Sequence, residues 1–435
     1  MKLHGTMQIE DNQLYIGGVS VKSLAEAYGT PLYVFDEENL INRAKSFLHY
    51  FQSDKFSTVI NYAAKAFSNL YIFGLIGELG LSLDVVSEGE LYTAIKAGIA
   101  PERINLHGNN KLPRELEMAL DYRVATITID HPTEFSLLSA LCRKRRQEID
   151  VLLRLNPCIP AATHKYIQTA QKDSKFGMSI ADSKTYNLIQ EMNADPYLNL
   201  KGVHAHIGSQ ILDREFFFEE AEVMLSFIHD VKTTLNISLS EVNLGGGFGV
   251  YYTANDKSFD LPLFLTEYIK IIENLIDEYD LDIDTVSIEP GRSLINDSGN
   301  ILYTVGSVKY PLQGRPYVFV DGGMTDNIRP VLYEASYEAG LANRMNDLPD
   351  DLYRVAGKCC ESGDVLIQEV FLPKPKPGDL LIVPAAGAYT YAMSSNYNRI
   401  PKPAVVFVNN GKSALAVKRE DYEDLIRNDL SYMSL

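Results

Sequence analysis

Short apolar segments alternate with amphipathic segments from about residue 57 to residue 289. Most of the apolar segments end in a polar or glycine-rich turn, which is typical of buried strands. The intervening segments repeat apolar residues at helical spacing, as Leu40, Ala44 and Phe47 do before the first strand. We predict eight strands, at residues 57–62, 82–86, 103–107, 125–130, 150–155, 201–207, 241–244 and 285–289.

Eight strands alternating with helices match a (β/α)8 barrel better than an open doubly wound sheet, which usually has fewer strands. After Arg292 the pattern changes to strand-like segments without long helices, at residues 301–309, 316–321, 365–371, 379–383, 404–409 and 414–418. The opening segments 13–16 and 32–35 are also strand-like, and we expect them to pair with the C-terminal strands. The prediction is an α/β protein with a barrel over residues 36–292 and a β-rich domain, a barrel or sandwich, formed by residues 1–35 and 293–435.

Composition excludes several classes of function. The 435 residues carry 40 Lys+Arg and 57 Asp+Glu, a net charge of -17, which argues against a nucleic-acid partner. The first residues lack the apolar core of a secretion signal, and the longest nearly apolar run, 380–393, is too short to span a bilayer. Four cysteines form neither a disulfide framework nor a metal-binding spacing. We expect no membrane segment and a cytoplasmic location.

The chemically unusual residues cluster at the predicted strand ends. Reactive groups of such barrels lie just past the C-terminal ends of the strands. These positions hold Lys65 after the first strand, Asp84, His107, the pair His204 and His206, the glycines 245–247, and Glu289 after the last strand. This clustering predicts an active site at one end of the barrel.

Lys65 stands among Ala64, Ala66 and Phe67. Apolar surroundings lower the pKa of a lysine and suit it to form a Schiff base with an aldehyde. Most lysines are solvated surface charges, so the strand-end position is what favours a chemical role.

Two further groups allow more than one interpretation. The triple glycine lets backbone N–H groups approach a phosphate closely, but it also fits an ordinary tight turn. His204 and His206 share one face of the predicted strand and have a spacing that metal ligands use. Because no third ligand lies nearby in the sequence, we favour a ring-stacking role for His206 and a buried structural role for His204, and we expect no metal.

Glu289 discriminates between reactions if the cofactor is pyridoxal phosphate. A carboxylate beside the pyridine nitrogen keeps that nitrogen protonated, which makes the ring an electron sink for a developing carbanion. Decarboxylation needs such a sink, whereas an arginine at this position favours racemisation. The Pro290-Gly291 turn fixes the direction of the Glu289 side chain.

Taken together, several motifs resemble those of the diaminopimelate decarboxylases. They include YAAKAFSN at 62–69, HGNNK at 107–111, HIGSQ at 206–210, EPGR at 289–292 and CESGD at 360–364, so the resemblance extends over nearly the whole chain. That family belongs to the alanine-racemase-like, or fold type III, pyridoxal-phosphate enzymes. The resemblance implies a barrel, a β domain and active sites completed across a homodimer.

The resemblance also implies roles for individual residues. Lys65 holds the cofactor covalently, His206 stacks on its ring and Glu289 contacts its nitrogen. The implied cofactor-binding set is Lys65, Asp84, His206, Ser209, Gly246, Gly247, Glu289, Gly291, Arg292 and Tyr389. The implied substrate-binding set is Arg292, Arg329, Tyr333, Glu361 and Tyr389, and Cys360 is the proton donor supplied by the partner subunit.

The expected reaction is the decarboxylation of meso-diaminopimelate to L-lysine. Arginine forks bind carboxylates, so Arg292 and Arg329 suit the distal carboxylate, and Glu361 suits the distal ammonium. One alternative is a decarboxylase of ornithine, carboxynorspermidine or another diamino acid, which Arg329 disfavours. The other is a non-catalytic cofactor-binding protein like the short pyridoxal-phosphate homeostasis proteins, which the chain length and Cys360 disfavour.

Overall fold

The computed structural model describes residues 1–159, 174–257 and 259–432. The chain divides into two compact units. One unit comprises residues 43–250 and 257–294, and the other comprises residues 1–42, 251–256 and 295–435.

The first unit is a closed barrel of parallel strands. The strands follow the chain order β5 (Ser57–Ala63), β6 (Ser82–Val85), β7 (Ile104–Leu106), β8 (Thr126–Ile129), β9 (Ile149–Asn156), β11 (Leu198–His204), β12 (Glu241–Asn243) and β13 (Thr285–Ile288). Each pairs in parallel with the next, and β13 pairs with β5 to close the ring. The short β10 (Met178–Ser179) pairs in parallel with the C-terminal end of β9. All eight predicted strands are confirmed.

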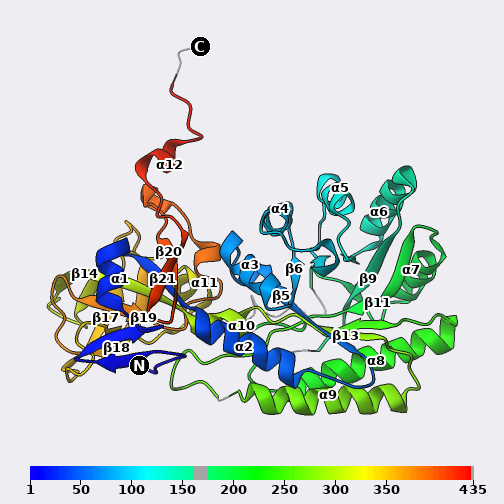
Figure 1. The fold of residues 1–435 in the computed structure, drawn as a ribbon, viewed down its shortest axis with the longest axis horizontal. Coiled ribbons are helices and arrows are strands. Elements are labelled where there is room, and N and C mark those ends of the chain that lie inside the picture. The colour runs from blue at the N-terminus through cyan, green and yellow to red at the C-terminus, as the bar shows by residue number, and fades with distance from the viewer. Residues whose placement is uncertain (160–173, 258, 433–435) are drawn as a thin grey trace. The chain divides into compact units, whose positions relative to one another are not determined.

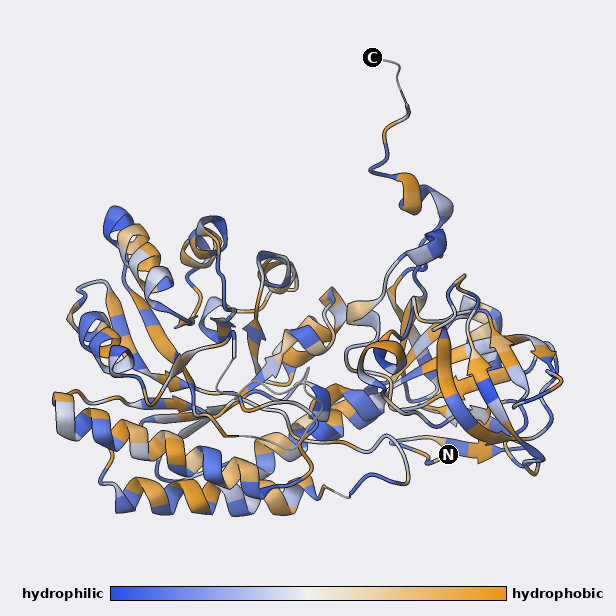
Figure 2. Cartoon of the chain, turned by 180° about the vertical axis from the view of Figure 1, so that it is seen from behind, coloured by the Kyte–Doolittle hydropathy of each residue, from blue (hydrophilic) through white to orange (hydrophobic). Residues whose placement is uncertain are grey.

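Helices surround these strands. They are α2 (Glu37–Tyr50), whose first turns belong to the other unit, α3 (Leu70–Glu78), α4 (Glu88–Lys96), α5 (Pro113–Tyr122), α6 (Pro132–Arg145), α7 (Ser183–Ala194), α8 (Glu215–Leu235) and α9 (Leu261–Glu278) (Figure 1). Apolar and polar residues alternate along α8 and α9 (Figure 2), as expected of helices with one face on the strands. No helix in the described ranges is both long and apolar enough to cross a membrane.

Polar side chains fix where several barrel helices begin. Asn69, Ser87, Asp182 and Asp260 each accept a backbone N–H from the first turn of α3, α4, α7 and α9, respectively. The Glu90 carboxylate accepts from the Val86 N–H at 2.8 Å. By fixing where the helices begin, these caps determine where the loops that follow the C-terminal ends of the strands stop.

The second unit is mainly antiparallel. Its large sheet has the order β18 (Val365–Leu372), β17 (Asp351–Ala356), β15 (Tyr317–Val320), β14 (Gly299–Lys309), β4 (Leu32–Asp36), β20 (Ala404–Asn409) and β21 (Lys412–Val417). The strand β19 (Leu380–Val383) pairs with β14 and with β16 (Gly340–Leu341). The helices α11 (Arg329–Tyr333) and α12 (Tyr422–Ile426) are short, whereas α1 (Val21–Tyr28) has two turns. The short α10 (Arg292–Ile295) belongs to the barrel unit except for its last residue.

Two sequence predictions for this unit need correction. Segment 32–35 pairs with β14 and β20 as expected. Segment 13–16 does not, because its strand β2 (Gln13–Ile16) lies in a separate three-stranded sheet with β1 (Gln8–Glu10) and β3 (Val19–Ser20). Strand β17 was not predicted, because Asp351 and Arg354 interrupt its apolar pattern. The separate sheet still packs its buried Leu14 and Ile16 into the same core as residues of β4, β14 and β20.

Candidate active site

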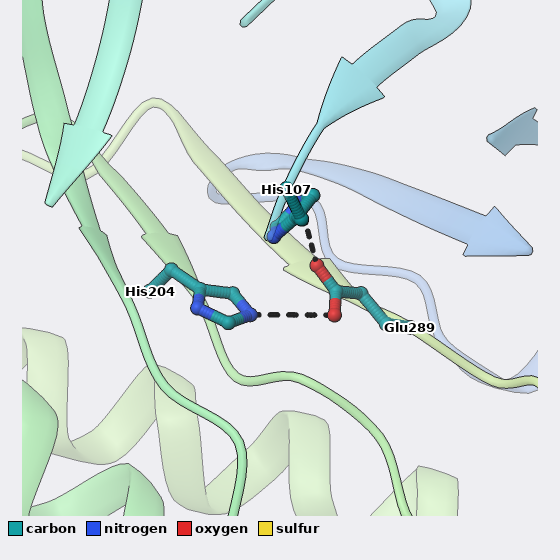
Figure 3. A group of neighbouring side chains, drawn as sticks. All are labelled: His107, His204 and Glu289. Carbon is teal, nitrogen blue, oxygen red and sulfur yellow. Dashed lines mark hydrogen bonds and ion pairs between the residues drawn. The ribbon is translucent and has the colours of Figure 1, made fainter. Parts of the chain in front are cut away.

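Glu289 follows β13 and lies between two histidines from other strand ends. Its Oε1 is 3.1 Å from His107 Nε2, and its Oε2 is 3.3 Å from His204 Nε2 (Figure 3). The Asn243 amide donates to Oε1 at 2.8 Å. A carboxylate only accepts hydrogen bonds, so His204 donates from Nε2, whereas His107 Nε2 is in close electrostatic contact with Oε1. These three side chains stand at the ends of β7, β11 and β12, and they surround a carboxylate that is 5% exposed.

This environment keeps Glu289 ionised. Burial alone raises the pKa of a carboxyl group, but His107, His204 and Lys65 outweigh burial and hold the pKa of Glu289 well below its usual value. Burial lowers the pKa of His107 to about 4 and also lowers the pKa of His204. The site therefore presents a carboxylate held by two neutral imidazoles.

Asp84 approaches the same His107 nitrogen as Glu289 does. Its Oδ1 is 3.8 Å from His107 Nε2. Burial raises the pKa of Asp84 to about 6, and Glu289 adds to this shift while His107 opposes it. The two carboxyl groups therefore differ in protonation, because Glu289 stays ionised whereas Asp84 takes up a proton more easily.

His206 lies past the end of β11 rather than on a strand face with His204, which corrects the sequence prediction. The strand ends at His204, and the Gly246 N–H donates to His206 Nδ1 at 3.2 Å. Burial lowers the pKa of His206 well below its ordinary value, and the charge of Lys65 adds to this effect. The ring is thus neutral and oriented by the triple-glycine loop.

Lys65 lies in a short 3-10 helix, Ala64–Ala66, directly after β5. Its neighbours Ala64, Ala66 and Phe67 are buried, and Lys65 itself is half-buried. The charge of Lys65 acts on the pKa values of Asp84, His206 and Glu289. The barrel therefore brings Lys65 near the predicted site carboxylates and His206.

The glycines after β12 and β13 allow strand-end loops to approach one another. A Cβ on Gly246 would lie 2.1 Å from the Glu289 carbonyl oxygen, and one on Gly247 would lie 2.1 Å from that of Gly208. Gly247 also has a φ of +103°, which side chains rarely adopt. A Cβ on Gly291 would come within 3.1 Å of the Ala63 side chain. These loops leave a cradle of backbone at the same end of the barrel as Glu289.

Arg292 and Ser209 meet beside these loops. The Arg292 guanidinium donates to Ser209 Oγ from Nε at 3.2 Å and from one terminal nitrogen at 3.0 Å. Arg292 is buried and begins α10. The geometry places a cation and a hydroxyl together, a pair that suits an anionic group.

The predicted residues after position 295 belong to the second unit. Arg329 is buried, and its guanidinium donates to the Tyr252 hydroxyl at 2.7 Å and to the Tyr337 hydroxyl at 2.9 Å. The Tyr333 ring centre lies 5.9 Å from the guanidinium carbon. No acidic side chain in the described ranges forms an ion pair with Arg329. The result is a buried cation within a cage of phenols.

Cys360, Glu361 and Tyr389 also lie in this unit. Cys360 and Glu361 are exposed, and the Cys360 N–H donates to Asn398 Oδ1 at 2.7 Å. Tyr389 is half-buried and has a φ of +60°. Asp364 anchors the cysteine loop, because its carboxylate accepts the N–H groups of Cys359 and Met324, each at 2.7 Å.

Sequence reasoning assigned no role to His107 or Asn243, although both contact Glu289. His107 had a visible signal, since it stands at a strand end beside other unusual residues. Asn243 had none beyond its position before the triple glycine. The ligand atoms of His107, His204 and Glu289 lie within 4.8 Å of one another, a spacing open to a metal ion. The carboxylate already accepts a hydrogen bond from His204 and lies 3.1 Å from His107 Nε2, so we describe the trio as a clamp on the carboxylate.

The barrel end fits pyridoxal phosphate. A buried, ionised carboxylate suits a protonated pyridine nitrogen, and a glycine cradle with Arg292 and Ser209 suits a phosphate. A lysine at the end of β5 suits an aldehyde. Each of these features is present in the barrel unit alone.

Comparison with known proteins agrees with this chemistry. Residues 37–296 match the family described as pyridoxal-dependent decarboxylase, pyridoxal binding domain. A diaminopimelate decarboxylase of Bacillus subtilis is 50% identical and one of Staphylococcus aureus 41% identical, over 99% and 97% of this chain and 99% and 98% of theirs. The structure of the M. jannaschii diaminopimelate decarboxylase in complex with L-lysine superposes with a TM-score of 0.91 at 31% identity, over 99% of both chains. The chain therefore belongs to the pyridoxal-phosphate-dependent decarboxylases, in the diaminopimelate decarboxylase family.

Proposed function

We propose that this protein decarboxylates meso-2,6-diaminopimelate to L-lysine and CO2, the last step of lysine biosynthesis, with pyridoxal 5'-phosphate as cofactor. The observation that carries the proposal is the Glu289 carboxylate, buried and held by His107, His204 and Asn243. When bound, the cofactor supplies an electron sink for the electron pair left as CO2 departs. A carboxylate fixed in its charged form maintains that sink, because it keeps the ring nitrogen protonated.

Barrel residues hold the cofactor in this proposal. Lys65 would bind it covalently, and the neutral His206 ring would stack on it. Asp84 would also contact the cofactor. The phosphate is bound by Ser209, Gly246, Gly247, Gly291 and Arg292, and Tyr389 of the second unit also contributes. Support comes from the close approach of the glycine loops and from the Arg292–Ser209 pair.

Arg329 recognises the distal carboxylate of the substrate, with Arg292, Tyr333 and Tyr389 also in the substrate site. A buried guanidinium without an acidic partner favours a ligand that brings a carboxylate. The exposed Glu361 binds the distal ammonium. Together these groups select a substrate with two amino-acid ends.

Cys360 donates the proton that replaces CO2, and it acts from the partner subunit of a homodimer. The assignment rests on the CESGD motif and on the location of Cys360 in residues 293–435, whereas Lys65 belongs to the barrel over residues 36–292. The dimer, with residues 1–35 and 293–435 as the domain that completes the site, is part of the proposal. So is a cytoplasmic location, which the cysteine content supports.

The test is CO2 release from meso-diaminopimelate, L-lysine, L-ornithine and carboxynorspermidine by the parent and by Arg329→Ala. The parent should strongly prefer meso-diaminopimelate, because sites built on buried polar groups reject analogues that lack the partner by about 10⁴-fold or more. Arg329→Ala should lose most of that preference. Comparable turnover of lysine or ornithine by the parent would contradict the substrate assignment, and unchanged selectivity in the variant would contradict the role of Arg329.

A further inference from the structure

Lys111 is a buried cation that none of the roles above uses. Its side chain is 2% exposed, and three oxygen atoms each lie 2.6 Å from its Nζ. They are the carbonyl oxygens of Gly108 and Thr128 and the carboxylate Oε1 of Glu134. Nζ donates hydrogen bonds to the two carbonyl oxygens and forms an ion pair with the carboxylate.

The three acceptors come from the elements around His107. Gly108 directly follows His107 in the loop after β7, Thr128 lies in β8, and Glu134 lies in the first turn of α6. The Thr128 hydroxyl is also 3.5 Å from His107 Nε2, the nitrogen that lies 3.1 Å from Glu289 Oε1. Lys111 therefore ties together the backbone on two sides of the His107 imidazole.

We propose that Lys111 is a positioning residue, which holds the His107 imidazole against the Glu289 carboxylate through Gly108 and Thr128, with Glu134 fixing the ammonium. Burying a charged pair is costly, and a pair of apolar side chains is often at least as stable. Stability alone therefore does not account for this ammonium. The two carbonyl contacts do, since an apolar side chain cannot bond both the loop after β7 and strand β8.

The inference rests on the proposed role of Glu289 at the cofactor nitrogen. Lys111→Met keeps the approximate side-chain length and removes both hydrogen bonds and the ion pair. The His107 imidazole then loses its fixed place, and a displacement on the order of 1 Å at an active site costs roughly 10²-fold in rate. We expect kcat to fall by about 10- to 100-fold and the dissociation constant of pyridoxal phosphate to rise.

The acid limb of the kcat profile provides a readout that lost stability would not move. Glu289 is faced by His107 after β7, His204 of β11, Lys65 after β5, Asp84 of β6, Arg154 of β9 and Glu220 of α8. Of these, Lys111→Met perturbs His107, through Gly108 and Thr128. Without the fixed His107 imidazole, Glu289 takes up a proton at higher pH, so the acid limb should move to higher pH.

Three further variants complete the experiment. Lys55→Met is the matched control, because Lys55 also pairs with an acidic side chain, Asp277, at 2.5 Å, but is 44% exposed. Glu134→Gln keeps an acceptor for Lys111 and should retain most of kcat and of the cofactor affinity. Glu134→Leu removes that acceptor and should reproduce part of the Lys111→Met phenotype, which keeps the test available if Lys111→Met does not fold.

Cofactor affinity is measured by equilibrium dialysis on each purified protein, independently of turnover. The proposal is overturned if Lys111→Met, or Glu134→Leu in its place, matches Lys55→Met in cofactor affinity and acid limb. Failure of the proposed function would give different results from failure of the Lys111 proposal. In that case the Glu289→Gln variant would keep the parental rate, or the parent protein would be inactive on meso-diaminopimelate.

Discussion

Glu220→Gln should stabilise the protein, increasingly so as the pH rises. Glu220 lies on α8, is fully buried, and neither of its carboxyl oxygens has a hydrogen-bond partner among the described residues. Burial, with a smaller contribution from Glu289, raises the pKa of Glu220 well above its ordinary value of 4.5. The native protein therefore holds this proton in a pH range where the unfolded chain has released it.

The sign and the size follow from proton linkage. A group whose pKa is higher in the folded state favours folding less as the pH rises from its unfolded pKa to its folded pKa. The loss is about 1.4 kcal/mol per pH unit. If the carboxyl stays protonated through pH 7, the penalty accumulated from 4.5 to pH 7 is about 3 kcal/mol. Glutamine does not titrate, so Glu220→Gln removes up to this amount.

The assay is urea unfolding of the holoenzyme, followed by circular dichroism at several pH values between about 5 and 8. The stability difference between Glu220→Gln and the parent should be small near the lower limit and should grow with pH. Glu222→Gln is the matched control, since Glu222 is exposed on the same helix and the charge change is the same. A difference that does not vary with pH, or that Glu222→Gln reproduces, would refute the reasoning.

Three other predictions concern the site and its frame. Glu289→Gln should bind pyridoxal phosphate but lose most of its decarboxylation rate, because an amide cannot hold the ring nitrogen protonated; parental turnover in a CO2-release assay would count against this. Mixing inactive Lys65→Ala and Cys360→Ala proteins should restore some activity through heterodimers with one intact site, and no recovery despite demonstrated subunit exchange would argue against a shared site. Ser87→Ala should lower the unfolding free energy by about 1 kcal/mol through loss of the α4 cap, measured by urea unfolding; an unchanged value would mean that the cap contributes nothing.

Much of the fold could be predicted from the sequence because its signals are local. The eight barrel strands are short apolar segments bounded by turns, and Gly98 and Ser87 mark the two ends of α4. Lys65 and Glu289 could be selected because barrel topology places strand ends together, whatever the intervening sequence. Strand β17 was missed because polar residues interrupt its apolar pattern. Pairing with the neighbouring strands β15 and β18 holds it in the sheet nevertheless.

Only the tertiary structure decided which of the strand-end residues meet. His107, His204 and Asn243 come from separate strands, and ring closure brings their donors onto the Glu289 carboxylate. The same holds for Lys111, which in the sequence is one more lysine after a loop, and for Glu220, which in the sequence is one more acid on an amphipathic helix. Burial and hydrogen-bond partners depend on residues far apart in the chain, so the charge state of each group is set by packing rather than by its neighbours in sequence.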